Sequence, residues 1–264
     1  SSAASDVYKR QQMGLSGREN YMTILQYRFP IQCYVLMGYG LFLAICILIP
    51  GLAGGAIAGE RERKTLDLLL TTHLSPWKII LGKLESSLCL IFLISFSTLP
   101  VIGLVLIYGG ITLVNLFQLI LNLVITGIFI GSIAIFYSAI IRKTTVAVIL
   151  SYVTVVLLVF GTMGILFGTG YIQQMRGMYQ EGFTGIRLGG LVYLLYFNPA
   201  VTLYGLIGQQ TTNAYGLVRL CDYFGDYSHS FGVEHMVELS ILVQLGCSAL
   251  LLIAAGRHIN PMRK

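Results

Sequence analysis

The side chains best suited to direct chemistry lie close together near the C-terminal end of the chain. Imidazoles and carboxylates at this density are ligands that zinc and other divalent metals prefer, so one interpretation is a metal-dependent membrane enzyme. The competing interpretation, which we favour, is a solvated loop beside a membrane span. The residues are Asp222, Asp226, His229, Glu234, His235 and Glu238. The catalytic signatures HExxH and GxSxG do not occur in the sequence, and we expect no catalytic residue, metal site or cofactor.

A second group of polar residues lies inside an apolar stretch. Gln118, Asn122 and Thr126 recur at intervals of four, which places them on one face of a helix. This candidate translocation face either lines a path for a substrate or forms hydrogen bonds between helices, and the sequence does not decide between the two. A channel or a passive scaffold would need rings of polar residues, and the spans contain few.

The elements that position these residues follow from composition. The chain has 264 residues, of which 56% are hydrophobic and 11% charged, with a mean hydropathy of +0.79. Soluble domains carry about 25% charged residues, so the solvent of this protein is a bilayer. Charge-free runs of about 20 residues mark membrane spans, and helices are expected because the runs lack the alternation of barrel strands. The spans are placed near 35–58, 86–108, 115–140, 146–168 and 239–256.

Residues 191–208 form a sixth apolar stretch that Asn198-Pro199 interrupts. An Asn-Pro step disfavours helix at the asparagine and removes a backbone donor at the proline. We therefore expect two half-helices that re-enter from the extracytoplasmic side. The fold class is an all-α integral membrane protein with about five transmembrane helices and this re-entrant segment.

Charge asymmetry supports that topology. With five spans and the first end of the chain outside, the inner segments hold most of the basic residues, as the positive-inside rule requires. Orientation thus explains the net charge of +6, and no nucleic-acid partner is expected. The inner basic residues are Arg61, Arg63, Lys64, Lys78, Lys83, Arg142, Lys143, Arg257, Arg263 and Lys264. Residues 1–11 are interpreted as a non-native or disordered leader, and 12–264 as one transmembrane domain.

The most informative segment is the inner loop 59–84, between the first two spans. Alternating charges at Glu60, Arg61, Glu62 and Arg63 open it. Next, an i, i+3, i+4 apolar face at Leu66, Leu69 and Leu70 predicts a short amphipathic helix, either a plain linker at the interface or a helix docked in a partner's groove. Ser75-Pro76 starts a new helical turn, and Trp77 is an interfacial anchor.

This segment resembles the first cytoplasmic loop of type-2 ABC transporter permeases, with the pattern E-x-E-x-x-T-x-x-x-L-L-x-T-P-L-S-x-x-x-I-x-x-G-K. One departure is His73, where the pattern has proline. The resemblance extends more diffusely to the Arg142-Lys143-Thr144 turn, the Asn198-Pro199 segment and the basic tail. The matching residues are Glu60, Glu62, Thr65, Leu69, Leu70, Thr72, Leu74, Ser75, Ile79 or Ile80, Gly82 and Lys83.

The resemblance implies a permease subunit of a type-2 ABC exporter in a bacterial cytoplasmic (inner) membrane. In such families two six-span permeases form a homodimer or heterodimer, and this loop is a coupling helix seated in a groove of a cassette ATPase. The chain has no GxxxxGK[ST] loop, so ATP hydrolysis is expected on a separate subunit. A count of five spans further implies that an N-terminal span is missing from a truncated chain.

Gly51, Gly55 and Gly59 form two successive GxxxG steps at the inner end of the first span. Such a stripe lets another helix backbone approach closely. Both a subunit or gating interface and packing within the bundle remain open.

Overall fold

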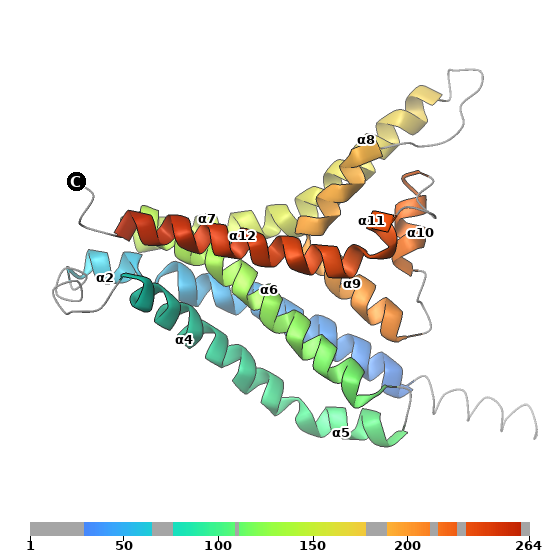
Figure 1. The fold of residues 1–264 in the computed structure, drawn as a ribbon, viewed down its shortest axis with the longest axis horizontal. Helices are drawn as coiled ribbons and strands as arrows, with labels where there is room; N and C mark the ends of the chain where they lie inside the picture. Colours follow the sequence, from blue (N-terminus) through green and yellow to red (C-terminus); the bar gives the residue numbers. More distant parts are fainter. Residues whose placement is uncertain are drawn as a thin grey trace, which may run out of the picture.

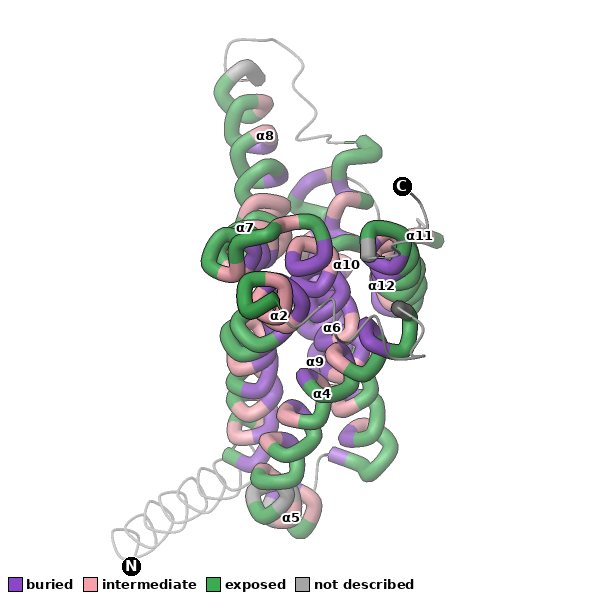
Figure 2. The backbone as a smooth tube through the Cα atoms, turned by 90° about the vertical axis from the view of Figure 1, so that its left-hand side faces the viewer, coloured by how far each residue is buried: buried purple, intermediate pink, exposed green. Residues whose placement is uncertain are grey.

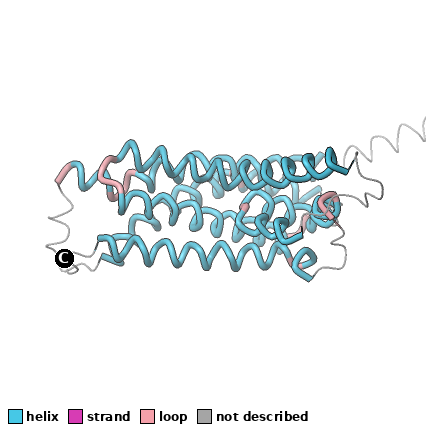
Figure 3. Tube along the Cα trace, turned by 90° about the horizontal axis from the view of Figure 1, so that it is seen from above, coloured by secondary structure: helices cyan, strands magenta, loops and turns pink. Residues whose placement is uncertain are grey.

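A computed structural model describes residues 29–64, 76–108, 111–177, 189–211, 216–225 and 231–259. Over these residues the chain forms helices and turns without a strand. Five helical segments are long and apolar enough to cross a membrane. A further apolar stretch consists of two helices that meet at a sharp bend. The expected all-α membrane fold is therefore confirmed. The five segments are Phe29–Glu62, Trp77–Ser97, Leu113–Ile140, Thr144–Met175 and Met236–His258. Seen from above, they run along a common direction (Figure 3).

Helix α6, Leu113–Ile140, lies at the centre of the bundle. Most of its residues are buried, and it lies between α7 and α12 when the bundle is viewed from one end (Figure 2). The Thr112 hydroxyl caps it by accepting a hydrogen bond from the Asn115 N–H at 3.2 Å. Gly127 permits close packing of α6 on α4, since a Cβ there would lie 2.5 Å from the Cδ1 of Ile91 in α4.

The second span begins earlier than the predicted 86–108. Helix α4 covers Pro76–Ser97 and the shorter α5 covers Leu99–Tyr108, with a break at Thr98. Counting charge-free residues excluded the first turns of α4 because they carry Lys78, Lys83 and Glu85. Lysine side chains can reach the interface from inside a span, and Lys83 also has an acidic partner, so the helix tolerates these charges.

The fourth span is a composite that continues beyond the predicted 146–168. It consists of α7 (Thr144–Val156), a five-residue π-helix (Leu157–Gly161) and α8 (Thr162–Gly177). Figure 1 shows α8 diverging from the rest of the bundle. A π-helical turn inside an α-helix is often found at functional sites.

The bend predicted at Asn198 is present. The 3₁₀ helix η2 (Gly189–Phe197) and α9 (Pro199–Gln210) meet at 90°. Asn198 is the N-cap of α9, and its side-chain oxygen accepts a hydrogen bond from the Ala200 N–H at 2.9 Å. Pro199 occupies the first helical position, where its missing N–H leaves no partner unsatisfied.

Different helices and helix termini lie at the two ends of the bundle (Figure 1). We call one the α2 end: it carries α2 (Ala58–Glu62), the first turns of α4 and α7, and the last turn of α12 (Met236–Ile259). The start of α6 and the short helices α10 (Gly216–Asp222) and α11 (Phe231–Glu234) lie at the opposite end. The predicted leader 1–11 lies outside the described residues.

Candidate functional site

The first element of the site is the junction where the first span ends. Residues 29–54 are helical, residues 55–57 form a turn, and α2 follows. The buried Ser138 hydroxyl of α6 accepts hydrogen bonds from the N–H groups of Ile57 and Ala58, each at 2.9 Å. Because these donors would otherwise be unsatisfied at a helix start, Ser138 holds the junction against α6.

Two glutamates of α2 reach two other spans. Glu60 forms an ion pair with Lys83 of α4 at 2.6 Å. The Glu62 carboxylate accepts hydrogen bonds from the N–H and hydroxyl of Thr144, the first residue of α7, at 3.1 and 2.6 Å. A carboxylate at a helix N-terminus is favourable because it meets free N–H groups and the positive end of the helix dipole.

Together these contacts make α2 a junction between three spans: α4 through Lys83, α6 through Ser138, and α7 through Thr144. We call Glu60, Glu62, Lys83, Ser138 and Thr144 the α2 junction. The connection of α2 to α4 continues through residues 65–75, which lie outside the described part of the chain. A force applied to that connection would act on three spans at once.

The predicted coupling residues divide into two groups. Glu60, Arg61 and Glu62 lie in α2 and Arg63 follows it, while Thr65, Leu66, Leu69, Leu70 and Ser75 lie outside the described residues. Pro76 and Trp77 begin α4. The Trp77 indole packs against α12, where a Cβ on Gly256 would lie 3.0 Å from the ring.

The glycine stripe of the first span faces α7. Cβ atoms built on Gly51, Gly55 and Gly59 would lie 2.9 Å from the Tyr152 hydroxyl and 3.3 and 3.6 Å from the Thr144 side chain. Tyr152 also donates a 2.6 Å hydrogen bond to the backbone oxygen of Ile47. The stripe therefore contacts the same helix that Glu62 caps.

The three residues of the candidate translocation face have different environments. Gln118 is exposed, and its side-chain oxygen accepts a hydrogen bond from Gln210 of α9 at 3.1 Å. Asn122 and Thr126 are 1% and 0% exposed. Neither the Asn122 amide nor the Thr126 hydroxyl has a hydrogen-bond partner among the described residues.

A second buried polar group surrounds the bent pair. The Asn198 amide donates to the Val159 carbonyl at 2.9 Å and to the Thr162 hydroxyl at 2.8 Å. One turn further along α9, the Thr202 hydroxyl contacts Ser240 at 2.6 Å and accepts a hydrogen bond from Gln244 at 2.9 Å. These bonds connect α9 to the fourth and fifth spans.

The acidic and histidine cluster does not assemble into a site over the part that is described. No three His, Cys, Asp or Glu side chains come close enough to hold a metal ion within the described ranges, and Asp226 and His229 fall outside them. His235 instead stacks on the Phe231 ring, with centroids 4.4 Å apart.

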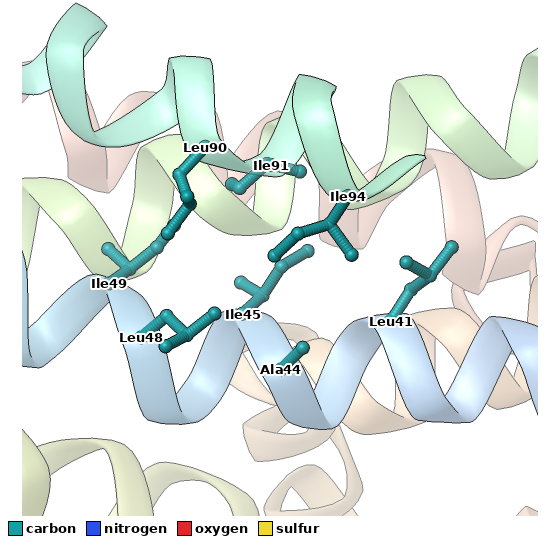
Figure 4. A pocket seen from close by; sticks show the side chains of 8 residues that line it. All are labelled: Leu41, Ala44, Ile45, Leu48, Ile49, Leu90, Ile91 and Ile94. Atoms are coloured by element: carbon teal, nitrogen blue, oxygen red, sulfur yellow. The ribbon is translucent and has the colours of Figure 1, made fainter. Parts of the chain in front are cut away.

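The first span and α4 pack through apolar side chains, which face one another in Figure 4. The crevice between them, lined by residues such as Ile45, Ile49 and Ile91, has a volume of about 10 Å³. A space of this size is at the lower limit for one water molecule, so this interface is a packing contact and no substrate site.

A model of the ABC-2 family transporter proteins matches residues 3–255 of the chain. The chain belongs to this family. The match covers the described bundle except for its last residues, 256–259, and begins inside the segment 1–11 that was predicted to be a leader. No curated protein and no solved structure matches the chain. This ABC-2 protein is a multi-pass membrane protein and a transport component, in agreement with the resemblance drawn from the inner loop.

Sequence reasoning missed the role of Ser138 and the partners of the two glutamates. Ser138 is one of several small polar residues in α6, and nothing in its neighbourhood in the sequence marks it. Glu62 and Thr144 are 82 positions apart. Glu60 and Lys83 both belong to the motif of the inner loop, so the sequence did single out the two residues of this ion pair.

Proposed function

We propose that this ABC-2 permease couples ATP hydrolysis on a partner cassette ATPase to export of a substrate, with the α2 junction as the point where force enters the bundle. The supporting observation is that Glu60, Glu62 and Ser138 tie α2 to α4, α7 and α6. A partner that moves residues 65–75 would thereby move several spans together. Export rests on the resemblance of the inner loop to that of type-2 exporters.

We also propose that the α2 end faces the cytoplasm of a bacterial cell. Arg61, Arg63, Lys83, Lys143 and Arg257 all belong to segments at this end, and basic residues concentrate on the cytoplasmic side of membrane proteins. The bent pair then lies toward the outer face. Its 90° bend, and the contact of Gln210 with Gln118 near the start of α6, support re-entry from that side.

The test of coupling is co-purification of this chain with a co-expressed cassette ATPase. The double change Leu69→Asp, Leu70→Asp introduces two charges into the apolar face predicted from the sequence of the inner loop and is expected to abolish association. Tyr223→Asp, Phe231→Asp is the matched control, because both aromatic residues are exposed at the opposite end of the bundle. Equal ATPase recovery with both variants would refute the coupling role.

For the substrate path, we propose that Asn122 and Thr126 become accessible when α6 moves relative to its neighbours. The polar atoms of both side chains have no partner in the part of the chain that the structure describes. A buried polar atom without a partner costs free energy that a substrate or water would recover. In the complex, Asn122→Leu should lower ATP-driven transport while ATPase association remains unchanged. Leu121→Ile on the exposed side of α6 is the control. Normal transport by Asn122→Leu would refute the proposal that this face of α6 lines the substrate path.

A further inference from the structure

A groove distinct from the α2 junction lies between the fourth and fifth spans. Its floor is α6, through Phe129, Ile133 and Phe136, and its walls include Thr154 of α7 and Leu250 of α12. Figure 2 shows α6 between these two helices. The volume is about 350 Å³, which is within the range of small-molecule pockets, about 300–1,000 Å³.

The lining indicates a hydrocarbon occupant. Phe129 and Ile133 are 2% and 5% exposed, whereas Leu250 on the rim is 67% exposed. Two lining residues carry hydroxyl groups, Tyr137 and Thr154. The Thr154 hydroxyl donates to Tyr137 Oη, and it also lies within hydrogen-bond distance of the Leu150 carbonyl, each at 2.9 Å. A polar ligand would therefore find few free partners, while an acyl chain would bury apolar surface.

The charges near the groove indicate the head group of that occupant. Arg142 and Lys143 immediately precede α7, and Arg257 lies in the last turn of α12; all three are exposed at the α2 end. No Asp or Glu occurs between Glu85 and Glu181 or after Glu238. The end of the groove that points to the α2 end is thus flanked by basic residues on both walls.

The distance from the basic residues to the groove agrees with a lipid whose head group lies at Arg142, Lys143 and Arg257. Leu250 precedes Arg257 by seven positions and Thr154 follows Lys143 by eleven, which at 1.5 Å per residue gives about 10–16 Å along the helices. Half of the hydrocarbon core of a bilayer is about 15 Å thick. A chain that starts at the basic residues therefore ends inside the groove.

We propose that the groove binds an acyl chain of an anionic phospholipid from the leaflet at the α2 end, with its phosphate held by Arg142, Lys143 and Arg257. The lipid separates α7 from α12 and fills space that protein side chains leave empty. This site is independent of the proposed coupling, because it requires neither the ATPase nor residues 65–75.

The test uses the full-length permease in detergent without an ATPase. Bound lipid is counted by native mass spectrometry during titration with phosphatidylglycerol or with phosphatidylcholine of the same chains. Phosphatidylglycerol should bind more tightly and raise the melting temperature more. Leu250→Trp should weaken its binding about tenfold, since a bulky ring removes contact for several methylene groups. Leu242→Trp on the same helix is the matched control, because Leu242 is 65% exposed and does not line the groove.

A head-group variant separates charge from shape. Arg257→Gln should weaken phosphatidylglycerol binding about fivefold, as one basic residue near a membrane contributes about that factor, and should leave phosphatidylcholine unaffected. Arg219→Gln in α10, at the opposite end, is the control. Equal binding of both lipids, or equal effects of Leu250→Trp and Leu242→Trp, would overturn the proposal. A change of oligomeric state in Leu250→Trp without lipid loss would assign the groove to a second copy of the chain and equally overturn it.

Discussion

Two asparagines in this bundle are almost equally inaccessible and yet differ completely in their bonding. Asn198 has 0% exposure and uses its amide for three hydrogen bonds, to Val159, Thr162 and Ala200. Asn122 has 1% exposure and has no hydrogen-bond partner among the described residues. The first is explained by folding alone, because it fixes the bend between η2 and α9. The second costs stability in the observed conformation, so folding does not explain it, and a role in transport is the proposal that does.

The largest effect is expected for Asn198→Leu. Leucine has a similar volume but leaves the Val159 carbonyl and the Ala200 N–H without their partner, and it removes the cap of α9. The expected loss is about 2–4 kcal/mol of unfolding free energy. Thermal unfolding of the permease in detergent measures it. A variant as stable as the wild type would show that the bend is held by packing alone.

Asn122→Leu should leave the unfolding free energy unchanged or raise it, in contrast to the loss expected for Asn198→Leu. Replacing an unpaired buried amide by an apolar group of similar shape is neutral or stabilising, here by as much as about 2 kcal/mol. The same unfolding assay, run beside Asn198→Leu, compares the two positions directly. If Asn122→Leu loses as much stability as Asn198→Leu, Asn122 has a partner in the folded protein and the contrast between them fails.

A smaller loss is expected for Glu62→Gln, which extends the comparison to a polar pair at the surface. The neutral amide caps α7 less well than the carboxylate, so the melting temperature should fall, though by less than for Asn198→Leu. Because exposed charge interactions are screened by salt, the difference from the wild type should shrink in 1 M salt. In a Thr144→Val background, Glu62→Gln should have a reduced effect. Additive effects would mean that the two residues act separately.

Gln118→Leu should have the smallest effect, a loss of about 0.5–1 kcal/mol, since it removes one exposed hydrogen bond to Gln210. The measurement sharpens the comparison within α6, where Gln118 has a hydrogen-bond partner and Asn122, one turn away, has none among the residues described. Gln210→Leu should produce a similar or larger loss, because Gln210 also donates to the Asn115 carbonyl and accepts a hydrogen bond from Tyr34. A gain of stability in Gln118→Leu would mean that the Gln118 hydrogen bond does not stabilise the fold, and the contrast with Asn122 would fail.

The elements that sequence predicted correctly are those under local constraint. A helix in the bilayer must satisfy its own backbone hydrogen bonds. The charge-free runs therefore predicted the five long apolar helices of the structure in the correct order. Asn198-Pro199 predicted a bend because proline restricts its own backbone and that of its neighbour. The start of the second span was misplaced because a local charge count treats Lys83 as unpaired. The ion pair with Glu60 that moderates its cost connects residues from different spans.

The amino-acid sequence thus determined the solvent of this protein, the order of its five long apolar helices, the bend at Asn198 and, through the pattern from Glu60 to Lys83, its family. The tertiary structure decided which polar groups find partners: Glu62 with Thr144, Ser138 with the start of α2, and, among the described residues, none for Asn122. The physical reason is that partition into a bilayer is a property of each segment by itself. Pairing between helices depends on their rotation and relative height, which only the packing of the whole bundle sets.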